Sequence, residues 1–145
     1  WWTMQDREPL DHWTRGAITL IGDAAHPMLQ YIAQGACQAL EDAAHLAAEV
    51  ARAPGAPADA FRSYQAARAP RAARVQRTAR TWGEICHTDG IGATLRNALL
   101  ARRGDGDYED VDWLYGHRPE DEAPSPAPSM ATLGTPPCPG SGEDP

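Results

Sequence analysis

The first apolar run of the chain predicts a short buried strand. Ile18, Leu20 and Ile21 supply the β-branched and apolar side chains that are typical of such a strand. Gly22 follows directly, and a glycine at the end of a strand allows a tight turn and lets a ligand approach the backbone closely. Upstream, within residues 1–6, Trp2 and Met4 alternate with Thr3 and Gln5 as an edge strand would.

The next segment, from about Ala36 to Arg52, predicts an alanine-rich amphipathic helix. Its small side chains suit close packing, so we expect its apolar side to lie against a sheet. The apolar side consists of Leu40, Ala43, Ala44, Ala47 and Val50. The polar side consists of Gln38, Glu41, Asp42, His45 and Glu49.

A second helix is predicted to begin near Pro57, after a proline- and glycine-rich stop. Pro70 should kink this helix. Residues 83–90 break the pattern, and Ile91 to Arg102 predicts a third helix. The expected buried stripe of the second helix, which has the charged Arg68 as an exception, consists of Phe61, Tyr64, Val75, Ala79 and Trp82.

Charge is segregated along the chain, whose formal net charge is −7. Residues 62–80 hold six arginines and no acid, whereas residues 105–122 hold eight acids and one arginine. The basic helix lacks interleaved aromatic residues and the chain as a whole is acidic, so we expect no nucleic-acid partner and a face that is solvated or covered by another domain.

Composition limits the kind of protein further. Apolar residues make up 42%, but many are alanine and there is one Phe, so the core must be small. No apolar run approaches the roughly 20 residues of a membrane span. The three scattered cysteines favour a reducing, cytoplasmic setting. The histidines and cysteines show no metal-ligand spacing, so no metal is predicted.

Candidate chemistry gathers around Asp23 and the start of the first helix. Asp23 follows the predicted strand, in the crevice where open α/β sheets bind ligands. The first N–H groups of the helix, near Gly35 and Ala36, have no partner within it and favour a partly negative group. A carboxylate can accept hydrogen bonds from hydroxyls, and the N–H groups at a helix start can donate to a polarised carbonyl. A flavin nucleotide has both kinds of group, in its ribityl chain and in its ring.

Three stretches carry a family resemblance: Gly22-Asp23-Ala24-Ala25-His26-Pro27, Gln34-Gly35 and Glu41-Asp42-Ala43. Together they resemble the second flavin motif of single-component FAD-dependent aromatic hydroxylases, the p-hydroxybenzoate hydroxylase-like family. The longer run through Gln30 and Tyr31 looks most like the branch of 3-hydroxybenzoate 6-hydroxylase and salicylate hydroxylase.

The resemblance implies an α/β parent protein, with an FAD-binding dinucleotide fold and a substrate domain. The glycine-rich turn that opens such a fold is missing, so we expect this chain to be a C-terminal fragment, mostly α-helical with one or two short strands. Residues 1–16 would end the substrate-domain sheet and return the chain. Residues 17–118 would form the C-terminal part of the FAD-binding domain with the following helices, and 119–145 a disordered tail.

The resemblance also implies roles for individual residues. Gln30, whose amide can accept from and donate to a phenol, would act in catalysis, or is a surface amide. His26 is a structural histidine or, less in keeping with its corner position, a general base. The implied cofactor-binding residues are Gly22, Asp23, Gln34, Gly35 and Ala36. The implied substrate-binding residues are Pro27, Gln30 and Tyr31. Asp23 could instead cap the loop, Gln34 could shape it, and Tyr31 could pack beneath it.

The function implied is an FAD-dependent monooxygenase that hydroxylates a phenolic or aromatic acid with NADH or NADPH and dioxygen. Its partners would be a small aromatic substrate and the missing N-terminal part of the same protein, with no membrane contact, and a homodimer is left open. The fragment alone would be inactive. Two alternatives remain open: a related flavoprotein epoxidase or halogenase, and a non-catalytic helical interaction fragment.

Overall fold

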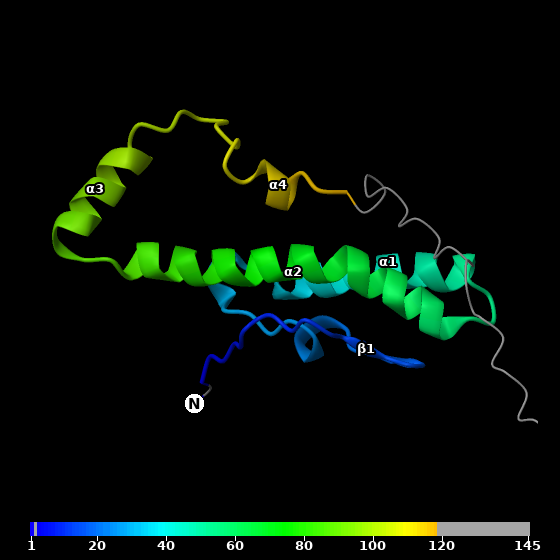
Figure 1. The fold of residues 1–145 in the computed structure, drawn as a ribbon. Coiled ribbons are helices and arrows are strands. Elements are labelled where there is room, and N and C mark those ends of the chain that lie inside the picture. The colour runs from blue at the N-terminus through cyan, green and yellow to red at the C-terminus, as the bar shows by residue number, and fades with distance from the viewer. Residues whose placement is uncertain (2, 119–145) are drawn as a thin grey trace, which may run out of the picture.

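The computed structural model describes Trp1 and residues 3–118, and helices dominate it (Figure 1). The expectation of a mostly helical chain with one or two short strands is confirmed. The predicted disordered tail lies outside the described residues. In chain order the elements are β1 (Thr14–Arg15), β2 (Ile18–Thr19), the 3-10 turns η1 (Gly22–Ala24) and η2 (Gln30–Ile32), α1 (Gly35–Arg52), α2 (Pro57–His87), α3 (Gly90–Leu100) and α4 (Asp112–Tyr115).

The strands form an antiparallel hairpin rather than a buried strand within a larger sheet. Arg15 pairs with Ile18 across a turn at Gly16, whose φ of +60° suits glycine. The Ile18 side chain is 72% exposed, so the prediction of a buried strand is wrong for this chain. The physical reason is that, among the described residues, no further strand lies beside β2 to cover it.

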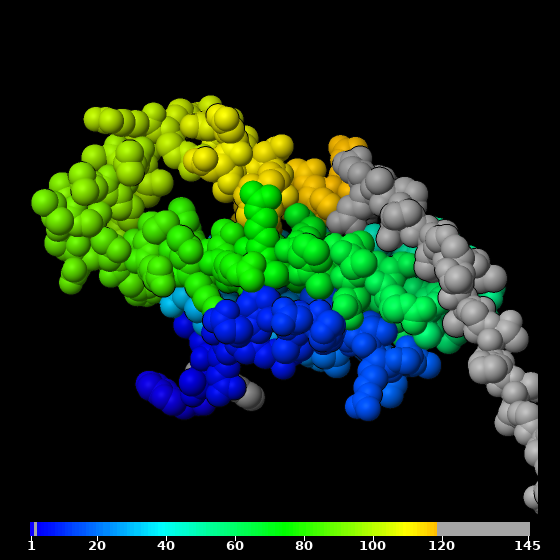
Figure 2. All heavy atoms as spheres, in the orientation of Figure 1, coloured from blue at the N-terminus to red at the C-terminus, as the bar shows by residue number. Residues whose placement is uncertain are grey.

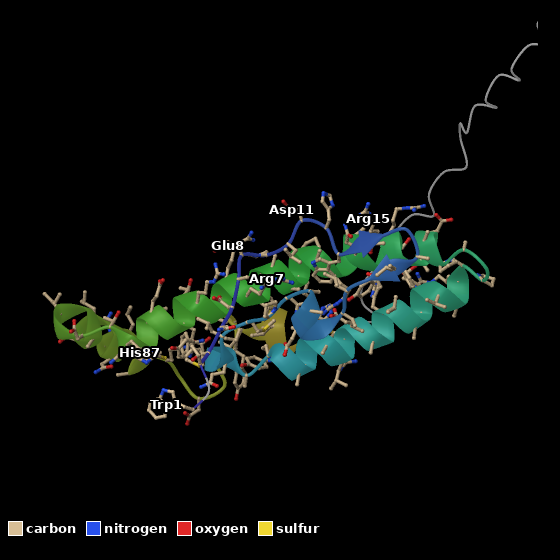
Figure 3. All side chains as sticks on the ribbon, turned by 90° about the horizontal axis from the view of Figure 1, so that it is seen from below. Trp1, Arg7, Glu8, Asp11, Arg15 and His87 are labelled. Carbon is tan, nitrogen blue, oxygen red and sulfur yellow. The ribbon has the colours of Figure 1, made fainter. Side chains whose placement is uncertain are left out.

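The N-terminal segment is held by side chains and not by a sheet. Trp1 and residues 3–6 contain no strand, so the expected edge strand is not formed there. The segment runs along α2 (Figure 3), where Arg80 pairs with Asp6 and Glu8. Asp6 and Glu8 raise the pKa of the Arg80 guanidinium, mainly through the hydrogen bond from Arg80 to Asp6.

Helix α1 packs on α2 with its polar side, the reverse of the expectation. Its buried residues are Gln38, Asp42, His45 and Glu49. On the other side Leu40 is 72% exposed and Val50 45% exposed. The apolar side has no cover among the described residues, so its packing against a sheet stays a prediction for the longer protein. The polar side is buried because α2 presents a charged partner for it, Arg68.

Helix α2 begins at Pro57 as predicted but continues to His87, through the break expected at Gly83. Pro70 lies inside the helix, and the ribbon changes direction within its first half (Figure 1). Tyr64, Val75 and Ala79 are buried as predicted and Phe61 partly so. Trp82 is 38% exposed, so its predicted burial is wrong.

The apolar core is small and lies between the hairpin, η1 and α2. It consists of Trp13, Ala25, Tyr64 and Ala72. The Trp13 ring lies 5.4 Å from the His26 ring and 5.7 Å from the Tyr64 ring, measured between centroids. The Tyr64 hydroxyl donates to the Leu20 carbonyl at 3.3 Å, which ties α2 to the chain two residues before Gly22. Burial, followed by the negative charge of Asp42, raises the Tyr64 pKa, so the hydroxyl stays protonated.

The last described segment returns to α2 and is anchored there. Arg74 stacks over the Trp113 ring at 3.7 Å, and Leu114 is buried. Arg71 donates to the carbonyls of Trp113 and Leu114, at 3.0 and 3.2 Å. Between this return and α3, the space-filling view shows a hollow over the second half of α2 (Figure 2). Within the described residues, no helix is long and apolar enough to cross a bilayer.

Candidate functional site

The turn that carries Asp23 is built on Gly22. Gly22 has a φ of +58°, and its carbonyl accepts the N–H groups of Ala25 and His26 at 2.8 and 2.9 Å. Asp23 is exposed, and its carboxylate takes part in none of the hydrogen bonds formed among the described residues. The alternative role of Asp23 as a cap is therefore not seen, and the carboxylate is available to a ligand.

The start of α1 offers unpaired backbone donors. Gln34 precedes the helix and makes no side-chain cap. No backbone hydrogen bond among the described residues uses the N–H of Gly35, Ala36 or Cys37. The positive end of the helix dipole lies at the same point, so this end attracts a partly negative ligand atom.

The two halves of the predicted site lie side by side. Oδ1 of Asp23 is 4.0 Å from the position that a Cβ on Gly35 would occupy, and Cγ of Met28 is 3.9 Å from it. The structure thus brings a free carboxylate and a free helix start together. A side chain at position 35 would partly fill the space between them.

Gln34 shapes the loop before α1. Its side chain is buried, and its Oε1 accepts from Nε2 of Gln38 at 3.4 Å. The residue before it, Ala33, has a φ of +52°, an uncommon conformation for alanine, and it ends η2. These contacts account for Gln34 through loop geometry, and its proposed contact with a cofactor stays a prediction.

The loop between the two halves carries the three predicted substrate residues. The Pro27 carbonyl accepts from Nε2 of Gln76 at 2.9 Å, and Gln30 is exposed at the start of η2. The Tyr31 ring lies where a Cβ on Gly83 would be, and it meets the His87 ring edge-on at 5.3 Å between centroids. Tyr31 therefore packs on α2, and Gln30 is left free beside it.

A buried ionic network lies under the Asp23 turn. Oδ2 of Asp42 accepts from Nε2 of His26 at 2.6 Å and from the Gly22 N–H at 3.1 Å. Oδ1 accepts from Nε of Arg68 at 2.9 Å. Burial alone would raise the pKa of the Asp42 carboxyl, but these donors together lower it below its usual value.

His26 is fixed by this network as a structural residue. Because Asp42 is ionised and accepts only, Nε2 of His26 carries the proton that it donates. The ring is fully buried against Trp13, away from solvent. The structural alternative for His26 is thus the one that the geometry supports.

Glu41 extends the network to the surface. It accepts from both Arg68, at 2.6 Å, and Arg71, at 2.7 and 2.9 Å. Burial would raise the pKa of its carboxyl, but the hydrogen bond from Arg71 and the charges of both arginines lower it. Arg68, the charged exception in the expected buried stripe, and Arg71 are therefore used inside the fold and do not belong to a solvated face.

The roles of two residues that hold the turn were not predicted from sequence. Asp42 was quoted as part of the motif but was placed on the polar side of its helix, although Arg68 in a buried stripe called for an acidic partner nearby. Arg7 donates to the carbonyls of Ala24 and Ala25 and so holds the turn from the other side. Cys37 and Cys86 are exposed, and no cluster of three metal-ligating side chains occurs within residues 3–118.

Comparison with known proteins identifies relatives of this arrangement. Residues 1–79 match a family described as FAD binding domain. The 3-hydroxybenzoate 6-hydroxylase of Klebsiella oxytoca is 42% identical over 116 residues, which are 79% of this chain and 29% of that protein. The 3-amino-4-hydroxybenzoate 2-monooxygenase of Streptomyces cremeus is 41% identical over 116 residues, with the same shares of each chain.

A solved structure shares the fold. The salicylate hydroxylase substrate complex superposes with a TM-score of 0.61 and 33% sequence identity, over 82% of this chain and 29% of that one. The chain thus spans about three tenths of the length of the relatives that it matches.

Proposed function

The chain belongs to the family of FAD binding domains, and from this premise we propose that it forms part of a flavoprotein that hydroxylates a phenolic or aromatic acid. The electron donor is NADH or NADPH, and dioxygen is the second substrate. The resemblance that the motif around Asp23 suggests is confirmed at the level of the family.

The observation that carries the proposal is the pairing of Asp23 with the start of α1. The exposed carboxylate is suited to accept from a ribityl hydroxyl of FAD, and the N–H groups of Gly35 and Ala36 are suited to its polarised ring edge. Gly35 places no side chain between Asp23 and the start of α1, so we expect the ring edge to lie close to the backbone there. When bound, FAD supplies the redox chemistry, and the protein groups orient and polarise the cofactor.

The substrate would lie beside the loop of Pro27 and Gln30. Gln30 is exposed and its amide can both accept from and donate to a phenol, which favours the electron-rich form of the ring. The named relatives act on hydroxylated benzoates, which supports a phenolic acid as the substrate.

The remainder of the same protein would cover the apolar side of α1. Leu40 and Val50 are large exposed apolar side chains on a helix that the family uses in a larger fold. We propose that an N-terminal part of the protein, carrying the glycine-rich turn and the main sheet, packs on this side. The scattered cysteines favour the cytoplasm as its location.

Two experiments test the proposed function. Reading the DNA upstream of the codon for Trp1 should reveal a continuous frame that encodes a strand followed by a glycine-rich turn. The protein from that frame should bind FAD and oxidise NADH or NADPH in the presence of a hydroxybenzoate, with a hydroxylated product identified by mass spectrometry. An epoxide or a halogenated product, or a frame without that turn, would contradict the proposal.

The role of Asp23 has its own test in that protein. Asp23→Ala removes a charged hydrogen-bond acceptor worth about 1.5–3 kcal/mol, so we expect FAD to bind about 10–100-fold more weakly. Asp11→Ala is the control, because Asp11 is an exposed acid that belongs neither to the Asp23 turn nor to the start of α1. Equal FAD affinity in both variants would remove Asp23 from the site.

A further inference from the structure

One buried carboxylate joins the Asp23 turn to the two long helices. Asp42 is fully buried, and its Oδ2 accepts from the residue before Asp23, through the Gly22 N–H, and from the residue three positions after it, His26. The carboxylate therefore holds both ends of the turn. Asp23 projects from between these two fixed points.

The same helix carries the other half of the site. Asp42 lies on α1, two turns after the free N–H groups at Gly35. The turn is also seated directly on α1, because a Cβ on Gly22 would come within 3.3 Å of the Ala39 Cβ. The position of Asp23 relative to the helix start is thus set by one rigid element.

The charged groups around Asp42 keep its carboxylate in place. Arg68 donates to Oδ1 from α2 and also binds Gln38 and Glu41 on α1, so the carboxylate cannot rotate without breaking a buried ion pair. Without Asp42 the Gly22 N–H would be a buried donor with no partner, and the turn would move to satisfy it.

We infer that Asp42 is a positioning residue of the flavin site, which sets the distance between the Asp23 carboxylate and the start of α1. The inference rests on the function proposed above. Asp42 is fully buried beneath the turn, so we expect it to act without touching the cofactor. Its effect passes through the backbone of Gly22 and the ring of His26.

The test compares Asp42→Asn with Glu41→Gln in the FAD-binding parent protein. Each change neutralises one of the two carboxylates that pair with Arg68, but of the two residues only Asp42 contacts the turn. We expect Asp42→Asn to weaken FAD binding about 10–100-fold, by analogy with the loss of a group that orients a metal-binding side chain. Glu41→Gln should bind FAD within about twofold of the unchanged protein, whatever its melting temperature. Affinity is read from quenching of flavin fluorescence.

A second variant and a second readout cover the case in which Asp42→Asn does not fold. Asp42→Glu keeps the charge for Arg68 but displaces the carboxylate by one methylene, so it should fold and still weaken FAD binding. Amide hydrogen exchange of the folded apoprotein should rise over residues 20–26 in either Asp42 variant and not in Glu41→Gln.

The outcomes separate this inference from the proposed function. A folded Asp42 variant that binds FAD as tightly as the unchanged protein, while Asp23→Ala binds it weakly, overturns the positioning role alone. Full affinity in Asp23→Ala as well would overturn the proposed site. Equal losses in Asp42→Asn and Glu41→Gln would also overturn the inference, because they would indicate general loosening of the helix pair.

Discussion

Nε of Arg68 lies 2.9 Å from Oδ1 of Asp42, with 1% and 0% of the two side chains exposed. This ion pair crosses the interface between α1 and α2, where a helix pair of this size would ordinarily place leucines. The guanidinium also reaches Gln38 and Glu41, so its donors are satisfied by three side chains of one helix. The interface is consequently specified by charge and hydrogen-bond geometry more than by apolar area.

Removal of Arg68 should be far costlier than removal of a surface arginine. Arg68→Met leaves Asp42 charged and buried without its partner, so we expect the free energy of unfolding of the parent protein to fall by about 3–5 kcal/mol. Arg62→Met is the matched control, since Arg62 and Asp59 are both exposed, and should cost less than about 1 kcal/mol. Urea unfolding followed by circular dichroism measures both, and equal losses would refute the central role of the pair.

Acid should weaken the helix pair. The pKa values of Asp42 and Glu41 lie below their usual 3.8 and 4.5 in the fold, so the unfolded chain binds protons first as the pH falls. Their contribution to the free energy of unfolding is complete at pH values above the pKa values of the unfolded chain. It is lost as the pH drops through the pKa values of the folded protein, by up to about 1.4 kcal/mol per pH unit for each group. The groups facing them are His26, Arg68, Arg71 and His117.

The urea midpoint measured from pH 7 to pH 3 checks this. We expect it to fall below about pH 4.5, the usual pKa of a free Glu side chain. In Glu41→Gln the midpoint at pH 7 should be lower and the decline with acid shallower. A steeper decline in that variant would contradict the assignment.

Gly35→Ala should separate stability from cofactor binding. A Cβ there meets its neighbours at 3.9 and 4.0 Å, which is ordinary contact, and the backbone needs no positive φ. The change should leave stability equal or raise it by up to about 1 kcal/mol, because alanine favours a helix. FAD affinity should nevertheless fall at least tenfold, about 1.4 kcal/mol, because the methyl group enters the space beside Asp23. Unchanged affinity in flavin fluorescence titration would show that no ring lies there.

Gly83→Ala should force the Tyr31 ring out of its place, because the new Cβ would overlap it. Overpacking of this kind costs about 1–3 kcal/mol. In a protein that already carries Tyr31→Ala, Gly83→Ala should cost little stability. The double-mutant cycle should therefore give a coupling energy above about 0.5 kcal/mol between the two positions. Gly104→Ala is the control, since a Cβ at Gly104 meets nothing within 4 Å. Additive effects at positions 83 and 31 would rule out the contact.

The motif around Asp23 could be predicted from sequence because its signals are local. A glycine with positive φ, an acid directly after it and a glycine at a helix start are fixed by the chain within a few residues, and the structure brings Asp23 and Gly35 together. The starts of α1, α2 and α3 were likewise found within a residue or two, from alanine content, Pro57 and apolar spacing.

Which side of α1 is buried in this chain could not be predicted from the sequence. Periodicity identifies the apolar side of a helix, but it does not show whether the described residues contain the element that packs on that side. Leu40 indicated a covered side and is exposed, whereas Asp42 indicated a solvated side and is fully buried. The signal for Asp42 lay 26 residues away, in Arg68, and such a tertiary pairing is not visible in a local pattern.

The reversed sides of α1 make the chain a candidate for two-piece reconstitution. The buried ion pair holds α1 to α2, while Leu40 and Val50 lie exposed on the other side of α1. This apolar side is available to bind a second polypeptide. Expressed beside a separately encoded partner that bears the complementary sheet, it should assemble without a covalent link. Such split-gene complementation would use the exposed apolar side of α1 to control when the whole protein assembles.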